Sequence, residues 1–252
     1  MDGSTPINEE NVVNAIQELL YTPLEYIQTN RSTHLDTEFK PNNNTRAILD
    51  ADFLTPSYPA WTFGARNATG TSVDSFSFCR LRSTAFRSDY NRSGVEISTN
   101  QITGRHLIDK NKNITYIDNV QKAVTTYASF QADYNLLLFS VNNKGTSDNR
   151  KEVLKLYSFK LYDNGSLIRD YIPCKRSDTN QITLYDKVNH KFCKVATGTL
   201  TGGPSIFPEY SSVKNATVSF LGKALGYGIS TTNSKILNAQ TFKDVLNQLI
   251  PA

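Results

Sequence analysis

Short apolar runs separated by clusters of Asn, Gly, Ser and Asp fill the chain from residue 24 to about residue 203. No apolar period of 3.6 residues interrupts them, so the pattern predicts an antiparallel all-β domain of many short strands. The expected strands are Leu24–Ile27, His34–Phe39, Thr45–Phe53, Ala60–Ala65, Ser75–Leu81, Ala85–Tyr90, Arg105–Ile108, Ile114–Ile117, Asn135–Val141, Val153–Tyr162, Leu167–Ile172, Ile182–Asp186 and Lys191–Lys194.

Three places in this pattern carry more specific expectations. Asn164-Gly165 supplies the positive φ angles of a tight two-residue turn, which predicts a hairpin around it. Leu24–Ile27 and His34–Phe39 are expected to pair as the first hairpin. Asn135–Val141 is almost unbroken in its apolar character, as is typical of a strand covered on both faces.

The two ends of the chain have a different pattern. Apolar residues recur at helical spacing over residues 7–20, after the potential N-cap Asn8, and again over residues 239–250. Ala216–Leu221 is a further candidate strand. We therefore expect an N-terminal helical anchor segment over 1–23, a β-sandwich over 24–204 and a C-terminal extension with an amphipathic helix over 205–252. Helices this short need a partner to be stable.

Composition narrows the class of protein. The 252 residues include 13 Tyr and 13 Phe, which pack well on pleated sheets, and the net charge is only +4. The basic residues are scattered and no nucleic-acid-binding motif accompanies them, so we expect no nucleic-acid partner. We expect neither a signal peptide nor a transmembrane segment, because the start lacks basic and apolar regions and no run approaches about 18 apolar residues.

The three cysteines do not form the dense, even framework of a disulfide-stapled domain. Cys174 and Cys193 flank an expected hairpin, so a bridge between them is one alternative. The other is that these two and Cys79 are buried free thiols.

Several motifs then show a family resemblance in order and spacing. Leu24-Glu25-Tyr26-Ile27-Gln28, followed by His34 to Asn42, resembles the opening of concanavalin-like (laminin-G-like) domains of phage and gut-bacterial surface proteins. Further similar stretches are Phe63-Gly64-Ala65-Arg66, Arg87-Ser88-Asp89-Tyr90, Lys160 to Gly165, Arg169 to Cys174, Leu184 to Phe192 and Gly198 to Pro204. Thr5 to Asn11 is also similar to segments that begin many phage tail and fibre proteins.

The resemblance covers residues 24–204 and implies a jelly roll of two curved antiparallel sheets. Such domains often bind glycans and are occasionally only structural. Some hold calcium on rim loops, for which Asp74, Asp89 and Asp148 are the candidates here; a solvated turn carboxylate is the plainer interpretation of each. The sequence departs from the family pattern at Glu38 and His190, where glycine is usual.

No catalytic constellation stands out. Asp36 and Glu38 would share a strand face and could be a glycosidase-like pair, but Asp36 is better explained as a turn cap. The histidines (His34, His106 and His190) lie far apart, which disfavours zinc. No nucleophile elbow, P-loop or dinucleotide fingerprint occurs. We therefore expect a protein without enzymatic activity.

Binding candidates gather in two places. A Pro-rich loop enters the run that holds the lone tryptophan, and an aromatic ring there can stack on the C–H face of a sugar. The resemblance would place the neighbouring charged strands close by. The candidate carbohydrate-binding residues are Tyr58, Trp61, Arg66, Arg87, Asp89 and Tyr90. The plainer alternatives are a core role for Trp61 and a structural ion pair between Arg87 and Asp89.

Taken together, these features predict a bacteriophage virion protein that attaches to host cell-surface glycans. Release of the particle by lysis would bring it outside the cell without a signal peptide. We expect a homo-oligomer, with a trimer as one option, because several copies offset weak single-site affinity. Two alternatives are a purely structural virion protein that packs on other virion proteins, and a sandwich glycosidase.

Overall fold

The computed structural model describes residues 20–54, 58–69 and 73–206, and its regular secondary structure there consists of β-strands. Residues 23–175 and 180–206 form one compact unit, which holds every site discussed below. The described residues of a second unit are 20–22 and 176–179, where the Ser177 N–H donates to the Leu20 carbonyl at 2.9 Å. The expected helices over 7–20 (Leu20 excepted) and 239–250, and the expected strand Ala216–Leu221, lie outside the described residues.

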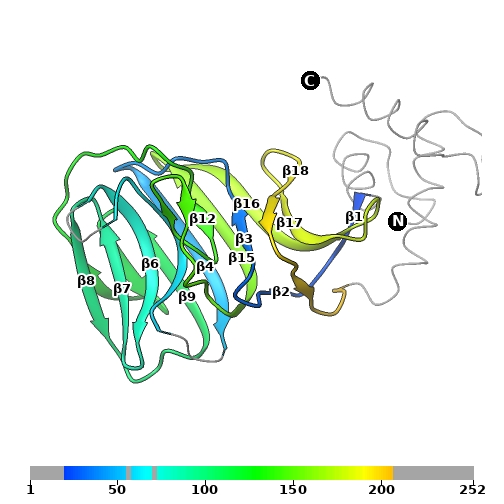
Figure 1. The fold of residues 1–252 in the computed structure, drawn as a ribbon, viewed down its shortest axis with the longest axis horizontal. Helices are drawn as coiled ribbons and strands as arrows, with labels where there is room; N and C mark the ends of the chain where they lie inside the picture. Colours follow the sequence, from blue (N-terminus) through cyan, green and yellow to red (C-terminus); the bar gives the residue numbers. More distant parts are fainter. Residues whose placement is uncertain (1–19, 55–57, 70–72, 207–252) are drawn as a thin grey trace, which may run out of the picture. The chain divides into compact units, whose positions relative to one another are not determined.

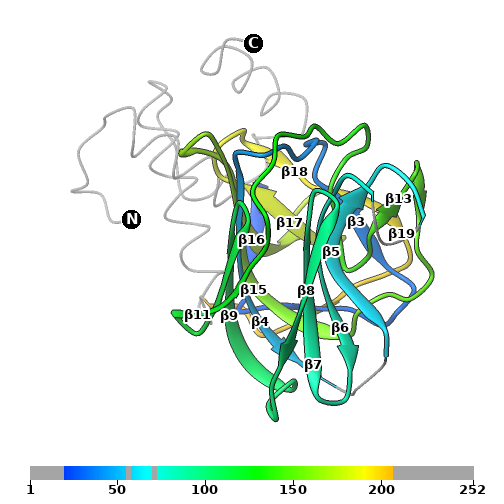
Figure 2. The ribbon, with the colours of Figure 1, turned by 90° about the vertical axis from the view of Figure 1, so that its left-hand side faces the viewer.

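The strands form two sheets, stacked face to face as a sandwich (Figures 1 and 2). The larger sheet has the order β11-β10-β9-β4-β15-β16-β17-β18, with β2 beside β15 and β20 beside β2. Its strands are β2 (Ile27–Gln28), β4 (Thr45–Phe53), β9 (Gly104–Asn111), β10 (Ile114–Ile117), β11 (Val120–Val124), β15 (Leu154–Asp163), β16 (Ser166–Arg176), β17 (Ile182–Asp186), β18 (Lys191–Phe192) and β20 (Thr201–Gly202), and β1 (Tyr21–Pro23) is assigned to the same sheet.

The smaller sheet has the order β19-β3-β12-β5-β6-β7-β8, with β13 beside β5 and β14 beside β13. Its strands are β3 (His34–Asp36), β5 (Ala60–Arg66), β6 (Ser75–Arg82), β7 (Ala85–Tyr90), β8 (Ser93–Ser98), β12 (Leu137–Leu138), β13 (Asn142–Asn143), β14 (Thr146–Ser147) and β19 (Lys194–Thr197). Pairing is antiparallel along both sheets, and β13 runs parallel to β5. The expected all-β antiparallel architecture is confirmed.

An apolar core fills the space between the sheets. Residues of β4 alternate strictly between buried and half-buried, so Leu49 and Phe53 point inward. Rings from both sheets meet there: Phe63 lies 5.9 Å from Phe78 and 5.7 Å from Phe159, measured between ring centroids. Each such ring contributes ~1.5–3 kcal/mol by leaving water, so these rings, together with the Leu, Ile and Ala residues around them, hold the sheets together.

Hairpins around short turns are confirmed where the turn chemistry is strong. β15 and β16 pair around Asn164 and Gly165, whose φ angles are 48° and 84°, as a two-residue turn requires. The pairs β6–β7 and β9–β10 also form as expected. Glu38 and His190 have φ angles of 54° and 53°, a conformation that glycine adopts most easily, which matches their place as departures from a glycine pattern.

The expected first hairpin is wrong. β2 pairs with β15 and β20 in the larger sheet, whereas β3 pairs with β12 and β19 in the smaller one. The five residues between β2 and β3 carry the chain from one sheet to the other. Thr29 fixes the start of this crossing, because its hydroxyl donates to the Glu152 carbonyl at 2.7 Å. A hydrophobic pattern alone does not tell a hairpin from a crossing between sheets.

The apolar run Asn135–Val141 is buried as expected, but it is not one continuous strand. Only Leu137–Leu138 pairs as β12, and Phe139 has a φ angle of 66°, which turns the chain. The Phe139 N–H donates to the Thr62 carbonyl at 2.7 Å, so its backbone is satisfied by β5 despite the turn. Two polar edge strands, β8 and β11, were not expected, because they carry few inward apolar residues.

All three cysteines are buried free thiols. Burial raises the pKa of the Cys79 thiol strongly and raises that of Cys193 to about 12. The alternative of a bridge between Cys174 and Cys193 is therefore wrong; Cys174 faces Thr183 across β16 and β17, and the Thr183 hydroxyl donates to the Cys193 carbonyl.

Candidate functional site

The structure brings four of the six expected binding residues onto one face. Trp61, Arg66, Arg87 and Asp89 lie on the side of the smaller sheet that is turned away from the core, where Trp61 pairs with Cys79 and Cys79 pairs with Arg87. Tyr90 points the other way and is fully buried in the core, where its hydroxyl donates to the Asn43 and Ala128 carbonyls. Tyr58 packs against the core. Tyr58 and Tyr90 therefore do not share a surface with the other four candidates, because Tyr58 precedes β5 and Tyr90 follows Asp89 by one residue and so points to the opposite face of β7.

The lone tryptophan is not an exposed stacking platform. Trp61 is only 6% exposed and packs with Cys79, Val141 and Leu81. Two guanidinium groups cover its ring, Arg66 at 5.3 Å and Arg150 at 5.8 Å from the centroid. The plainer interpretation of Trp61 as a buried residue is confirmed, and a sugar cannot stack on this ring unless the arginines move.

The two other arginines of this face have carboxylate partners. Arg87 Nε lies 2.6 Å from Asp89 Oδ1, so the structural ion pair is confirmed. Arg150 binds Asp148 through Nε and Nη2 at 2.8 and 2.6 Å. Burial alone would raise the pKa of Asp148, but the bonds from Arg150 outweigh it and lower that pKa.

The carboxylates considered for catalysis or calcium are engaged elsewhere. β3 ends at Asp36, whose Oδ1 accepts from the Glu38 N–H at 2.8 Å, so the turn-capping role is confirmed and the shared strand face is wrong. Glu38 pairs instead with Lys191 at 2.6 Å. Asp74 pairs with Arg92, as Asp89 and Asp148 do with their own arginines. Over residues 20–54, 58–69 and 73–206, no three His, Cys, Asp or Glu side chains gather as a metal site.

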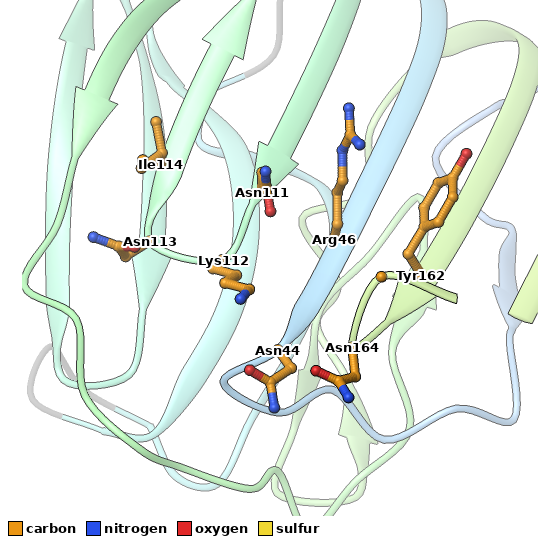
Figure 3. A pocket seen from close by; sticks show the side chains of 9 residues that line it. Asn44, Arg46, Asn111, Lys112, Asn113, Ile114, Tyr162 and Asn164 are labelled. Atoms are coloured by element: carbon orange, nitrogen blue, oxygen red, sulfur yellow. The ribbon is translucent and has the colours of Figure 1, made fainter. Parts of the chain in front are cut away.

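A pocket that sequence reasoning missed lies on the outward face of the larger sheet (Figure 3). One row of paired residues crosses four strands, Ile114 with Asn111, Asn111 with Arg46, and Arg46 with Tyr162. Three turns border this row, because the ends of β9, β15 and the start of β4 meet at the same edge. We call this hollow of about 420 Å³ the turn pocket; its lining is Asn44, Arg46, Asn111, Lys112, Asn113, Ile114, Tyr162, Asn164 and Gly165.

The turn pocket is polar, with Arg46 ion-paired on its sheet side and the cation Lys112 on its turn side. Arg46 binds Asp109 through two bonds, at 2.9 and 2.6 Å, and lies 5.5 Å from the centre of the Tyr162 ring. The hydrogen bond to Asp109 raises the pKa of Arg46 further above its usual value. A second hollow of about 300 Å³ shares Arg46 and Asn111 and reaches Tyr116, so a tyrosine stands on either side of the Arg46–Asp109 pair.

Three asparagine side chains of the turn pocket are available to bind a ligand. In the part of the chain that the structure describes, no hydrogen bond engages the side chain of Asn44, Asn111 or Asn164, whereas Asn113 donates to the Thr125 carbonyl at 2.7 Å. Asn-rich turns were visible in the sequence as turn signals. What the sequence did not show is that three of them meet, because this depends on the strand order β9-β4-β15.

Two buried charged groups lie between the sheets. Arg80 has no exposed surface and binds Glu152 through several bonds, including Nε to Oε2 at 2.9 Å. Lys110 is equally buried, donates to Ser88 Oγ at 2.7 Å and lies 4.8 Å from the centre of the Phe76 ring. Burial lowers the pKa of Lys110 to about 7. A serine beside a neutral lysine is a nucleophile arrangement, but both side chains are sealed in the core and no substrate reaches them.

Comparison of the sequence with protein-family models and with curated proteins finds no match. Among the described residues, no helix is long and apolar enough to cross a membrane.

Proposed function

We propose that this chain is a non-enzymatic, glycan-binding protein of a bacteriophage particle, with a concanavalin-like jelly roll over residues 24–204. Its partners are a host cell-surface glycan and other virion proteins, and it acts as a homo-oligomer, for which a trimer is one option. The resemblance of motifs in residues 24–204 to domains of phage and gut-bacterial surface proteins supports the proposed phage origin. The turn pocket is the observation that supports glycan binding.

The chemistry of the turn pocket suits a hydroxyl-rich ligand. Amide groups both donate and accept, so Asn44, Asn111 and Asn164 can each bind a pair of adjacent sugar hydroxyls. The Tyr162 ring offers a flat apolar surface for the C–H face of a sugar, and Arg46 holds that ring from one side. A few convergent polar groups around one aromatic surface are what a small-ligand site requires.

The pocket offers a binding site rather than a hydrolytic one. Among the described residues that line the two adjoining hollows, Asp109 is the one carboxylate, and Arg46 occupies both of its oxygens. Glycoside hydrolysis by the usual route needs two carboxyl groups about 5–10 Å apart on either side of the scissile bond. Assay of reducing-sugar release from host cell walls tests the glycosidase alternative, and any turnover would contradict the proposal.

A glycan array with matched variants tests the binding proposal. Tyr162→Ala should lower the signal by about tenfold or more, because it removes the stacking surface. Tyr157→Ala is the control, since Tyr157 lies on the same strand and the same sheet face but does not line the turn pocket. A blank array across host polysaccharides, or equal losses in both variants, would refute glycan binding at this site.

A purely structural virion protein remains the alternative, and one observation favours it. Val120, Val124 and Tyr127, at and just after the edge strand β11, are each more than half exposed. Exposed apolar groups beside an unpaired strand edge favour packing on a neighbour. Burial of Trp61 and Tyr90 does not separate the two functions, because both are already buried within the chain.

A further inference from the structure

The outward face of the smaller sheet contains a group of side chains whose polar atoms are incompletely satisfied. We define the Trp61 cluster as Trp61, Arg66, Asn143, Asp148 and Arg150. Over the described residues, the buried side-chain nitrogen and oxygen atoms that lack a hydrogen bond of good geometry are Trp61 Nε1, Arg66 Nε and Asn143 Oδ1. Of these, Trp61 Nε1 still faces the Asp148 carboxylate and helps to lower its pKa, so Arg66 Nε and Asn143 Oδ1 are the atoms that lack any partner. All three belong to this cluster, and buried polar atoms without partners usually mark a bound water, ion or ligand.

The cluster closes on itself through successive contacts. Arg66 and Arg150 lie over the Trp61 ring, Arg150 binds Asp148, and the Asn143 amide donates to Asp148 Oδ2 at 2.9 Å. β13 pairs with β5 so that Asn143 lies opposite Arg66, which closes this ring of contacts. These side chains are therefore held in place before any ligand arrives.

Arg66 is the arginine of this cluster that makes no direct ion pair on the described chain. Its guanidinium makes no ion pair or hydrogen bond there, whereas Arg87 and Arg150 each hold an aspartate. Burial against Trp61, together with the nearby charges of Arg87 and Arg150, lowers the pKa of Arg66 despite the attraction of Asp89. An arginine stays charged at any ordinary pH, so this site lacks an anion.

We propose that Arg66 and the Trp61 cluster form a binding site for one oxyanion, a carboxylate, sulfate or phosphate group, on the outward face of the smaller sheet. Arg66 is only partly buried, so an anion can approach its guanidinium from solvent. The planar guanidinium binds two oxygens of such a group at once. The orphaned Asn143 carbonyl oxygen would accept from a hydroxyl or water beside the anion. This site is separate from the turn pocket and does not depend on the glycan proposal.

The chain contains its own reporter for this site. Trp61 is the single tryptophan, so intrinsic tryptophan fluorescence comes from this cluster alone. The experiment titrates the full chain with sodium phosphate, sodium sulfate and sodium glucuronate, each against sodium chloride at the same ionic strength. Glucose, which lacks the carboxylate of glucuronate, controls for the sugar ring.

We expect a saturable fluorescence change with the oxyanions and none with chloride or glucose. Arg66→Gln should weaken it by about tenfold or more, because the bidentate contact is lost. Arg66→Lys should weaken it less, since it keeps the charge without the planar fork. Arg105→Gln is the matched control; it removes one arginine from the other sheet, where Arg105 pairs with Asp50. Circular dichroism establishes that each variant is folded.

The outcomes separate the sources and the alternatives. Glucuronate binding more tightly than free phosphate and sulfate points to an acidic sugar, and the reverse order points to a free ion or phosphate ester. If none of the oxyanions shifts the fluorescence, or if Arg66→Gln responds like wild type, the orphaned atoms hold structural water only and the proposal is wrong. Tyr162→Ala leaves this response unchanged, so failure here and failure of glycan binding are distinguishable.

Discussion

Lys110 and Arg66 are two basic side chains for which the described chain provides no ion-paired carboxylate. They differ in location and in whether they can lose their charge. Lys110 lies in the core, and with a pKa of about 7 it can lose its proton. Arg66 lies on the outward face and cannot lose its proton. The difference indicates that a buried cation needs no partner if it can become neutral, whereas a guanidinium needs an anion from the chain or from solvent. Arg80 in the core has such an anion in Glu152.

The largest effect should come from removing the carboxylate that Arg80 depends on. Glu152→Gln leaves a guanidinium with no exposed surface and no counter-charge, and we expect a loss of about 3–5 kcal/mol in the free energy of unfolding. Urea denaturation measures it. Asp50→Asn is the control, because it breaks the exposed pair with Arg105 and should cost less than about 1 kcal/mol. Equal losses would show that burial does not decide the value of the pair.

Replacing Lys110 should change how stability depends on pH. Its pKa is about 7 in the fold and near 10.5 in the unfolded chain. Between these values the unfolded chain binds more protons, so the contribution of Lys110 to stability rises as pH rises, and below pH 7 its penalty is complete. Lys110→Met removes this penalty. The free energy of unfolding of the variant minus that of wild type should therefore be about 1–3 kcal/mol larger at pH 6.5 than at pH 9.

Denaturant unfolding of both proteins at the two pH values measures this difference. Other groups titrate over the same range, but they do so in both proteins and cancel. An equal stability difference at pH 6.5 and pH 9 would mean that Lys110 keeps its proton in the fold.

A single substitution should leave Arg46 in the turn pocket without an ion-pair partner, as Arg66 is in the Trp61 cluster. Asp109→Asn frees Arg46 of its counter-charge, and we expect oxyanion affinity at the turn pocket to rise by about three- to tenfold, with a strong salt dependence. Isothermal titration with phosphate in an Arg66→Gln background measures it without interference from the Trp61 cluster. Asp50→Asn again serves as control, because it frees Arg105 outside that pocket; a gain of equal size there would show that any freed arginine suffices.

The smallest effect concerns the stability cost of Arg66 itself. Arg66→Met removes a charge that has no partner and keeps most of the apolar contact with Trp61, so the free energy of unfolding should change by no more than about 0.5–1 kcal/mol. Thermal unfolding in chloride buffer measures it. Adding phosphate should raise the melting temperature of wild type but not of Arg66→Met. A large loss in chloride alone would indicate that Arg66 is mainly structural.

Local patterns predicted the strands and the tight turns, but not the contacts between distant segments. The limits of Thr45–Phe53 follow from strict alternation, and Asn164-Gly165 specifies its own turn. Nothing local in Ile27 or His34 shows that the chain changes sheets between them, because the exposed polar residues Asn30 to Ser32 would fit a hairpin loop equally well. The same limit applies to Phe139, whose burial was predictable and whose turn was not.

The candidate sites show the same limit. The sequence placed Arg66, Arg87 and Asp89 on neighbouring strands through the resemblance, and they do share a face. It could not show that Arg150, from a segment more than 80 residues away, covers Trp61, or that Asn44, Asn111 and Asn164 meet. Both facts depend on strand order, which is a property of the whole sheet.

The three buried thiols have a practical consequence. A thiol must become a thiolate in contact with solvent before a disulfide reagent can attack it, and the folded chain withholds both conditions at Cys79 and Cys193. The rate of thiol modification therefore measures how often the side chains that cover each thiol move away, which for Cys79 are Trp61, Val141 and Leu81 on the outward face of the smaller sheet. Each of the two sheets therefore carries a native thiol whose modification rate reports local opening, and no cysteine has to be introduced.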